Sequence, residues 1–298
     1  MRYLITGATG FVGTALCRHL ITVRRDIIAL GRQKEFRLGA LDGVTYVRAN
    51  TMMPGDWQQH VETADVIVNL AGESILQRWS DYKRSRMWKS RVYTTRNLLT
   101  HMRAGQTLVN ISATGYYGDC GATVLDESAP CGNGFLSDLC RAWEADAQKA
   151  EEKGARVVIA RLGVVLGAGG ALEKMLPVFR LGMGGRLGSG HQWMPWIHMD
   201  DVTRALVTMA ESSEIRGIFN LVAPNPVTNR KFTETLGNVL NRPTLAPVPQ
   251  MVLNIIFGEA SRVMLDSQRA QPRGLLESGY VFQYADLHSA LTSLIDAA

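Results

Sequence analysis

Three hydroxyl-bearing side chains stand at or just after the end of one apolar run and could move a proton. Residues 107–112 have the composition of a buried strand that ends at Ser112, and Tyr116 and Tyr117 follow it. Ligands of open α/β sheets bind at the carboxyl ends of strands, so we take Ser112, Tyr116 and Tyr117 as candidate catalytic residues. A phenol far from a cation has a pKa of about ten and is a poor base at neutral pH. Packing and hydrogen bonding are therefore the alternative role for both tyrosines.

A second pattern, near the start of the chain, is suited to binding a dinucleotide. Residues 3–5 predict a strand, residues 11–20 have the apolar spacing of a helix, and Gly7, Gly10 and Gly13 mark the junction. These glycines would allow a tight turn, close approach of a pyrophosphate and close packing of the helix on the sheet. The alternative is a tight turn that binds nothing. The cofactor-binding residues expected here are Gly7, Thr9, Gly10, Phe11, Val12 and Gly13.

The end of the next predicted strand, residues 26–30, indicates which dinucleotide would bind. In dinucleotide-binding folds an acidic residue at this place binds the ribose 2′-hydroxyl and repels a 2′-phosphate. Here the strand is followed by Gly31 and Arg32, with Lys34 two positions later and no acidic residue at the tip. A guanidinium makes forked contacts with phosphate, so Gly31 and Arg32 favour NADP(H) over NAD. The alternative is that Arg32 is a surface arginine.

The elements that must position these residues alternate between strands and helices. Further strands are predicted at 44–48, 66–72, 157–167 and 217–222. Alternation of this kind is typical of a parallel sheet covered by helices on both faces. The predicted fold class is therefore α/β, a Rossmann-type doubly wound parallel sheet.

Several motifs resemble those of the extended short-chain dehydrogenases/reductases. Residues 6–13 contain Gly-x-x-Gly-x-x-Gly, and residues 69–72 match the Asn-x-Ala-Gly element. Residues 73–79 and 89–96, the sequence Gly-Tyr-Tyr-Gly at 115–118 and Trp-Ile-His at 196–198 with Asp201 are similar to one atypical branch. That branch is subfamily 39U, the "epimerase family proteins" within the NAD(P)-dependent epimerase/dehydratase family.

The resemblance implies further cofactor-binding residues and a division into domains. Residues 1–162 would form an NADP-binding Rossmann domain, to which residues near 195–222 return. Residues 163–298 would form a smaller C-terminal α+β domain on the substrate side. The additional residues expected near the cofactor are Leu70, Ala71, Gly72, Glu73, Arg78, Gly163 and Val164.

The sequence lacks the proton relay that is typical of this family. Typical members carry Tyr-x-x-x-Lys on the helix after the fifth strand, but no tyrosine here has lysine four residues later, and Leu136 and Cys140 occupy the matching positions. Either another group supplies the acid, or the protein binds NADP without the usual turnover. The expected function is hydride transfer on a small carbonyl or hydroxyl compound, possible substrates including a sugar-nucleotide-like one. A non-catalytic NADP(H)-binding sensor is the alternative.

The second half of the chain offers candidates for substrate contact. A glycine-rich segment, 167–190, predicts loops that close over a ligand or tight turns between packed elements. We expect four residues near it to line the substrate cleft: Arg186, Gln192, Trp193 and Trp196. Asp201 is expected to begin a helix that runs to Ala210, with His198 held by backbone contacts.

Composition and charge indicate whether the protein binds nucleic acid, a metal ion or a membrane. The net charge is +5, and residues 78–103 hold eight basic residues against one acid, so that segment carries +7 and the rest about −2. A solvated helix face or attraction of a small anion is expected there instead of nucleic-acid binding, because no nucleic-acid motif accompanies the charge. The four cysteines lack metal-site spacing, so no metal is predicted. With no membrane-length apolar run and no leader pattern, a cytoplasmic protein is expected, and its oligomeric state is left open.

Overall fold

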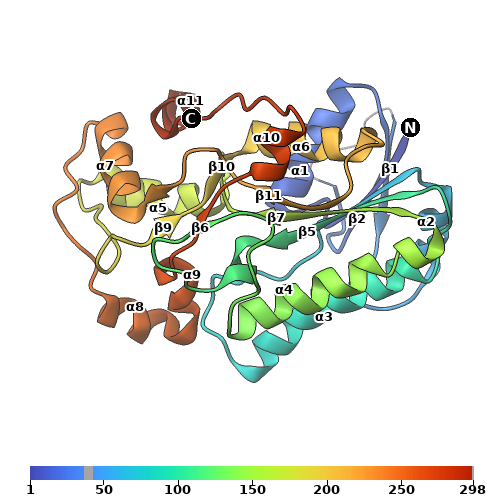
Figure 1. The fold of residues 1–298 in the computed structure, drawn as a ribbon, viewed down its shortest axis with the longest axis horizontal. Coiled ribbons are helices and arrows are strands. Elements are labelled where there is room, and N and C mark those ends of the chain that lie inside the picture. The colour runs from blue at the N-terminus through green and yellow to red at the C-terminus, as the bar shows by residue number, and fades with distance from the viewer. Residues whose placement is uncertain (37–42, 297–298) are drawn as a thin grey trace.

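The central element of the protein is a seven-stranded parallel sheet, seen in a computed structural model that describes residues 1–36 and 43–296 (Figure 1). The strand order is β11-β7-β5-β4-β1-β2-β3, and every neighbouring pair is parallel. The strands are β1 (Arg2–Thr6), β2 (Asp26–Gly31), β3 (Val44–Arg48), β4 (Val66–Asn69), β5 (Thr107–Ala113), β7 (Arg156–Leu162) and β11 (Gly217–Leu221). The predicted α/β fold with a Rossmann-type parallel sheet is confirmed.

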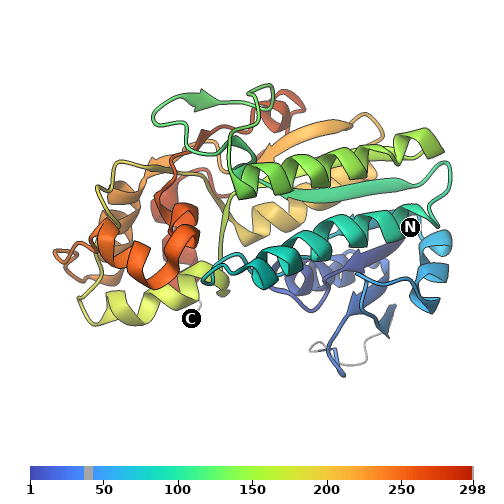
Figure 2. The same cartoon turned by 90° about the horizontal axis from the view of Figure 1, so that it is seen from below.

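Helices cover both faces of this sheet. One face carries α1 (Phe11–Thr22) and α6 (Met199–Glu211); the other carries α2 (Gln59–Thr63), α3 (Asp81–Leu99) and α4 (Phe135–Gln148). Figure 2 shows α3 and α4 running side by side across the sheet. In the described part of the chain, four short 3₁₀ helices join the larger elements: η1 (Asp56–Gln58), η2 (Thr114–Tyr117), η3 (Glu151–Lys153) and η4 (Gly258–Ser261).

Alternation along the strands builds two cores, one on each face. Tyr3 and Ile5 of β1 face α1 and α6, whereas Leu4 between them joins the core under α2, α3 and α4. Successive side chains of a strand point to opposite faces, and a parallel sheet buries both of them. The nearly continuous apolar runs in these strands follow from that burial.

Short strand pairs and helices, most of them from the second half of the chain, lie beyond the carboxyl ends of the strands (Figure 1, left). The pairs are β8 (Val164–Gly167) with β10 (Trp196–His198), β9 (Trp193–Met194) with β12 (Val227–Thr228), and β6 (Val124–Leu125) with β13 (Arg269–Ala270). The helices are α5 (Gly170–Arg180), α7 (Asn229–Leu240), α8 (Gln250–Phe257), α9 (Arg262–Leu265) and α11 (Leu287–Asp296). The short helix α10 (Arg273–Glu277) instead packs on β11 in the core that contains α1 and α6. A separate apolar cluster holds α5, α7 and α11 together. The domain boundaries given above stay a prediction.

The start of α6 differs slightly from the prediction. The helix begins at Met199, two residues before Asp201, and His198 caps it by accepting a hydrogen bond from the Asp200 backbone N–H at 3.1 Å. The buried Asp201 carboxylate accepts hydrogen bonds from the backbone N–H groups of Gln283 and Tyr284. His198 and Asp201 therefore serve helix capping and attachment of the C-terminal segment.

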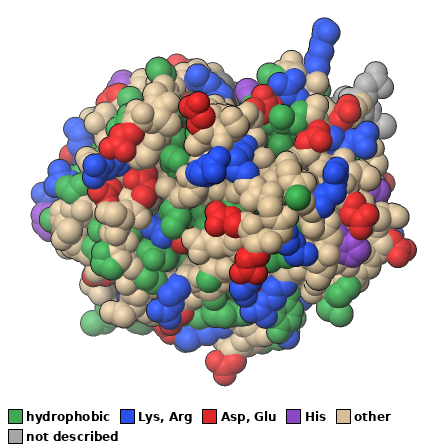
Figure 3. All heavy atoms as spheres, turned by 45° about the vertical axis from the view of Figure 1, so that its right-hand side comes forward, with side chains coloured by type: hydrophobic (Ala, Val, Ile, Leu, Met, Phe, Trp, Pro, Cys, Tyr) green, Lys and Arg blue, Asp and Glu red, His purple; other side chains and the backbone are tan. Residues whose placement is uncertain are grey.

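Charged side chains of both signs are mixed on the face shown in Figure 3. Six of the eight basic side chains between residues 78 and 103 contact other parts of the chain. Arg84, Arg86 and Arg96 form ion pairs, and Arg78, Arg91 and Arg103 donate to backbone carbonyls. Most of the basic side chains in residues 78–103 therefore form contacts within the protein. Among residues 1–36 and 43–296, no helix combines the length and apolar character needed to cross a bilayer.

Candidate functional site

The glycine loop between β1 and α1 has three glycines with different surroundings. Gly7 has φ +66°, and a Cβ there would lie 2.7 Å from the Leu70 carbonyl oxygen. A Cβ on Gly13 would lie 2.3 Å from the Gly7 carbonyl oxygen, whereas one on Gly10 would meet only that oxygen, at 3.1 Å. Gly7 and Gly13 are therefore required for packing, and Gly10 leaves room beside the backbone. The residue that precedes α1, Gly10, has no side chain to cap the helix. The backbone N–H groups in the first turn of α1 can therefore face an anion.

The side chains of this loop mainly pack against neighbouring elements. A Cβ on Gly31 would lie 2.6 Å from Thr9 Cγ2, so the loop touches the tip of β2. The Phe11 ring lies against the turn that follows β8, where Cβ atoms on Gly169 or Gly170 would come within 2.9 Å of it. Val12 packs partly buried against the core. A cofactor at this loop would consequently meet mostly backbone.

The tip of β2 carries an ion-pair cluster. Arg32 Nη1 lies 2.8 Å from Glu73 Oε1, and Arg86 Nη2 on α3 lies 2.5 Å from the same oxygen. Burial alone would raise the pKa of Glu73, but its hydrogen bonds with Arg86 and Arg32 lower that pKa below its ordinary value. The sequence shows no acidic residue at this tip; the structure brings one from the segment after β4. Arg86, which the sequence analysis did not select, joins the same cluster.

The segment after β4 packs against the glycine loop at one end and against Arg91 of α3 at the other. The Ala71 backbone N–H donates to Thr6 Oγ1 at 3.2 Å, which fixes the end of β4 against β1. A Cβ on Gly72 would lie 2.9 Å from Arg91 Cζ, and Arg91 donates to the Glu73 carbonyl oxygen at 3.1 Å. The structure thus places Leu70 and Ala71 beside Gly7 of the glycine loop, and Gly72 and Glu73 beside Arg91. It also adds Arg91, which the sequence analysis missed.

Arg78 lies in a different environment from Glu73. Its Nη1 donates to the carbonyl oxygen of Ile255 in α8 at 3.1 Å, and the nearby Arg84 pairs with Glu259 in η4. These contacts tie the segment before α3 to the C-terminal helices. A role for Arg78 in cofactor binding stays a prediction.

Gly163 and Val164 follow the carboxyl end of β7, as expected. A Cβ on Gly163 would lie 2.7 Å from the Pro195 carbonyl oxygen. The Val164 backbone N–H donates to that same oxygen at 2.8 Å. Close backbone packing explains the glycine, and contact of either residue with a nicotinamide stays a prediction.

Ser112 and Tyr117 belong to a buried hydrogen-bond network around an ion pair. Arg161 Nη2 donates to Glu144 Oε2 at 2.8 Å and Arg161 Nε donates to Glu144 Oε1 at 3.0 Å. Ser112 Oγ donates to Glu144 Oε1 at 2.6 Å, and Arg161 Nη1 donates to the Tyr117 hydroxyl at 3.0 Å. That hydroxyl donates to Asn220 Oδ1 at 2.7 Å. Both predicted catalytic hydroxyls are therefore committed to internal partners.

Tyr116 is placed differently from Tyr117. It is half-buried, and its hydroxyl has no hydrogen-bond partner among the residues that the structure describes. Arg161 Cζ lies 3.4 Å from the centre of the Tyr116 ring, a cation–π contact. Burial, by contrast, raises the pKa of Tyr117 to about 12. Of the three predicted catalytic residues, Tyr116 alone keeps a hydroxyl with no such internal partner.

The positions of the missing tyrosine and lysine are apolar or nearly so. A Cβ on Gly115 would lie 3.5 Å from Leu136 Cβ, so Leu136 packs against η2. Cys140 is buried, and its burial, with the nearby Glu144 carboxylate, raises the pKa of its thiol to about 11. A protonated thiol cannot supply the positive charge of a lysine. The Arg161 guanidinium lies against both tyrosine rings, with its Cζ 3.4 Å from the centre of the Tyr116 ring and 5.1 Å from that of Tyr117.

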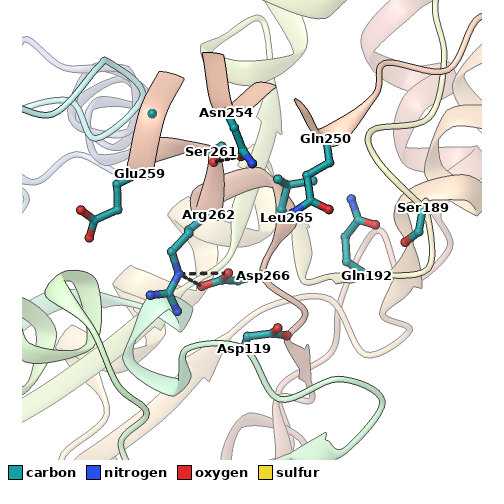
Figure 4. Close-up of a pocket in the computed structure, with 11 residues that line it drawn as sticks. Asp119, Ser189, Gln192, Gln250, Asn254, Glu259, Ser261, Arg262, Leu265 and Asp266 are labelled. Atoms are coloured by element: carbon teal, nitrogen blue, oxygen red, sulfur yellow. Dashed lines mark hydrogen bonds and ion pairs between the residues drawn. The ribbon is translucent and has the colours of Figure 1, made fainter. Parts of the chain in front are cut away.

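The predicted substrate residues separate in the structure. Gln192 lines a cavity of about 620 Å³ (Figure 4), whereas Arg186 and Trp193 are not among its lining residues, and Trp193 packs under the Arg269 guanidinium. Trp196 has no exposed surface, and its Nε1 donates to the Asn225 carbonyl oxygen at 3.0 Å. The prediction that Trp196 lines the cleft is wrong, because it packs in the core shared by α5, α7 and α11.

Glu144, Arg161 and Asn220 were missed for different reasons. Arg161 interrupts an apolar strand, and a buried arginine needs a carboxylate partner, so that signal was available in the sequence. Glu144 lies on a helix and Asn220 on a strand that is distant in sequence. Only the strand order brings Asn220 to Tyr117.

Comparison with known proteins agrees with this fold. Residues 3–221 match the model of the NAD dependent epimerase/dehydratase family, and residues 248–294 match a domain of unknown function, DUF1731. The chain is 35% identical over 302 residues to the Epimerase family protein SDR39U1 homolog, chloroplastic, of Arabidopsis thaliana. That match covers 99% of this chain and 87% of the relative.

Two solved structures share this fold. The human epimerase family protein SDR39U1, crystallised with NADPH, superposes with a TM-score of 0.88 at 33% identity, over 100% of both chains. A UDP-glucose 4-epimerase from Thermus thermophilus, in complex with NAD, shares the fold with a TM-score of 0.76 at 17% identity, over 99% of this chain and 98% of that one. The chain belongs to the NAD dependent epimerase/dehydratase family, in the branch of epimerase family proteins that includes SDR39U1.

Proposed function

We propose that the protein is an NADP-dependent oxidoreductase or epimerase-like enzyme that acts by hydride transfer on a small carbonyl or hydroxyl compound. The observation that carries the proposal is the cluster at the tip of β2, where two guanidinium groups share one carboxylate oxygen. Two positive charges against one negative charge leave a site that favours a phosphate. The human relative crystallised with NADPH supports the same cofactor.

Each part of the proposed cofactor site has a distinct task. The backbone of residues 7–13 would hold the pyrophosphate, because Gly10 leaves space beside it and α1 begins there. Arg32, assisted by Arg86, would bind the 2′-phosphate. Residues 70–73 would flank the adenosine ribose, and Gly163 and Val164 would lie toward the nicotinamide. When bound, the cofactor supplies or accepts a hydride.

The proton for this chemistry would come from Tyr116. Its phenol is the one predicted acid with no partner among the described residues, and the Arg161 guanidinium lies against its ring. Ser112 and Tyr117 would position that guanidinium through their hydrogen bonds to Glu144 and Arg161. Arg161 would thereby supply the positive charge near the tyrosine that lysine supplies in typical members of the family.

NADPH fluorescence tests the proposal. We expect the protein to bind NADPH, and the bound fluorescence to decay when a suitable carbonyl compound is added. The panel should include aldehydes, ketones and keto sugars, with a parallel sample lacking protein as the control. Absence of NADPH binding at millimolar concentration would refute the proposal.

One observation favours a second candidate function, a non-catalytic NADP(H) sensor. Leu136 and Cys140 replace the usual relay, and Ser112 and Tyr117 are held by internal partners. A sensor would bind NADPH tightly without oxidising it across the whole panel. It would also capture a partner protein only while the cofactor is bound, which distinguishes it from an enzyme whose substrate is missing from the panel.

A further inference from the structure

Exposed apolar side chains gather at one end of the protein, around α8 (Figure 1 and Figure 2, left). Of the sixteen large hydrophobic side chains that are exposed in the described part of the chain, half belong to two short segments, residues 178–183 and 245–256. These eight are Val178, Leu181, Met183, Leu245, Met251, Val252, Ile255 and Ile256. The two segments hold 6 and 12 of the 290 residues described, so the exposed apolar side chains are strongly concentrated there. A concentration of this kind marks an interaction site.

The outer side of α8 is apolar. Its exposed residues Met251, Val252, Ile255 and Ile256 have the i, i+1, i+4, i+5 spacing of one helix face, and Met251 and Ile255 are 73% and 66% exposed. Leu253, on the inner side, is the one buried residue of this helix. A helix with apolar side chains on both sides is expected to lie between two apolar layers. The protein supplies one layer, and no described part of the chain covers the other side.

The two segments pack against each other. Arg242 Nε donates to the Arg180 carbonyl oxygen at 2.8 Å, and the Val248 backbone N–H donates to the Arg186 carbonyl oxygen at 2.8 Å. Helix α8 begins two residues after Val248. The exposed side chains of both segments therefore adjoin. We call the exposed parts of residues 178–186 and 242–256 the α8 surface.

The charges of the α8 surface are all positive. Its two segments contain Arg180, Arg186 and Arg242 and no acidic residue, and the three arginines are exposed. Arg78, also exposed, adds a fourth guanidinium group, because it donates to the Ile255 carbonyl oxygen at 3.1 Å. Apolar side chains thus lie among four positive charges.

The positive excess remains when the neighbouring charged groups are counted. Beside α8 lie three carboxylates and two further guanidinium groups: Asp119, Glu259, Asp266, Arg84 and Arg262. Arg84 pairs with Glu259, and Arg262 pairs with Asp266. Six guanidinium groups therefore stand against three carboxylates. The other charged residues of α5 and α7 raise the excess by one: Glu173, Lys174, Arg230, Lys231 and Glu234.

We propose that the α8 surface binds the surface of an anionic membrane. Met251, Ile255 and Ile256 would enter the boundary between lipid headgroups and acyl chains, and the arginines would contact lipid phosphates. Apolar side chains bordered by basic ones are suited to attachment to one leaflet, which requires no spanning helix.

The charges and side-chain types argue against the other occupants. A two-fold contact between two copies of the chain would place the same patch on both sides of the interface, so the arginines of both copies would repel each other. Aromatic residues are enriched in protein–protein interfaces, and none is among the eight exposed side chains of 178–183 and 245–256. An anionic lipid surface requires neither a complementary shape nor aromatic contacts.

Flotation of the full chain with lipid vesicles tests the proposal. Vesicles of phosphatidylcholine alone are compared with vesicles that also contain about 40 mol% phosphatidylglycerol. We expect binding to the anionic vesicles to be at least about tenfold tighter, and to weaken severalfold when salt is raised from about 0.1 M to about 0.5 M. The variants Ile255→Ser/Ile256→Ser and Arg180→Gln/Arg242→Gln should each weaken that binding by about tenfold.

Two matched variants control for the loss of apolar surface and of charge. Leu276→Ser/Val281→Ser removes two apolar side chains that are 49% and 74% exposed, on α10 and in the segment after it. Arg18→Gln/Arg24→Gln removes two exposed arginines in and after α1. Both control variants should bind vesicles as the wild type does. Urea denaturation shows which variants fold, and if Ile255→Ser/Ile256→Ser does not, the arginine variants and the salt series decide.

Three results would overturn the proposal. The first is absence of binding to the anionic vesicles, which would point to an acidic protein as the partner of the α8 surface. The second is an equal loss of binding in the α8-surface variants and their controls. The third comes from sedimentation equilibrium: a dimer that dissociates in Ile255→Ser/Ile256→Ser would show that the α8 surface joins two copies of the chain.

Discussion

Glu144 and Arg161 form a buried, two-pronged ion pair between α4 and β7, with N–O distances of 2.8 Å and 3.0 Å. Neither side chain exposes more than 5% of its surface. Removing two charges from water is costly, and the pair is tolerated only where further hydrogen bonds satisfy both groups. Ser112 and Tyr117 provide those bonds. The pair therefore fixes the loop that carries Tyr116.

Replacing Glu144 with glutamine should destabilise the fold. The Glu144→Gln variant leaves the Arg161 guanidinium buried without a carboxylate, which costs about 3–5 kcal/mol. Urea denaturation gives the free energy of unfolding for comparison with the wild type. Glu152→Gln, an exposed residue in η3, should change it by less than about 0.5 kcal/mol. Equal stability of the two variants would contradict a buried pair.

Tyr117 should make the protein sensitive to alkaline pH. Burial raises its pKa from 10.0 to about 12, so the unfolded chain loses this proton before the folded protein does. The contribution to stability is full below pH 10 and is lost as pH rises through about 12. The stability difference between the wild type and Tyr117→Phe, measured by urea denaturation, should therefore shrink across that window. A constant difference would show that Tyr117 titrates normally.

Tyr116 should affect turnover without affecting stability. If Tyr116 donates the proton, Tyr116→Phe should lower kcat by about 100-fold or more and leave KM nearly unchanged. The measurement requires a carbonyl compound identified by NADPH fluorescence. Denaturation of the same variant should match the wild type, because the lost hydroxyl has no partner among the described residues. An unchanged kcat would remove Tyr116 from the mechanism.

Alanine substitutions at two glycines of the loop between β1 and α1 should have different effects. In Gly10→Ala the new methyl meets only the Gly7 carbonyl oxygen, at 3.1 Å, so the protein should fold and bind NADPH about tenfold more weakly. In Gly13→Ala the methyl lies 2.3 Å from that oxygen, and backbone cannot move aside. We expect a loss of stability of about 1–3 kcal/mol. Similar NADPH affinity in Gly10→Ala and the wild type would argue against a pyrophosphate beside Gly10.

The sheet could be predicted from local patterns because each strand is a short apolar run closed by small or polar residues. The start of α7 also has a local cause, because Thr228 caps the helix by accepting a hydrogen bond from the Lys231 N–H and threonine is a preferred capping residue. The glycine loop carried its own signal, since three glycines join a strand to a helix. Local sequence is sufficient for features of this kind.

Contacts between residues that are distant in sequence could not be predicted in the same way. Arg32 and Glu73 are 41 residues apart, and their contact depends on β1 and β2 lying side by side with β4. Trp196 was misplaced because an aromatic residue near a glycine-rich segment can face a ligand or a core, and only the packing of α5, α7 and α11 decides between them. An arginine within an apolar strand, such as Arg161, indicates from sequence alone that a buried carboxylate pairs with it. Which carboxylate does so, Glu144 on α4, can be known only from the folded structure.

The affinity ratio for NADPH and NADH in Arg32→Asp tests the central claim most directly. Fluorescence titration should show NADPH binding weakened by about 100-fold, because charge-assisted hydrogen bonds to the 2′-phosphate are replaced by repulsion. NADH, which lacks that phosphate, should bind almost as it does to the wild type. Arg216→Asp, with the same change of charge just before β11, should leave both affinities unaltered. Equal losses for NADPH and NADH in Arg32→Asp would contradict recognition of the 2′-phosphate at the tip of β2.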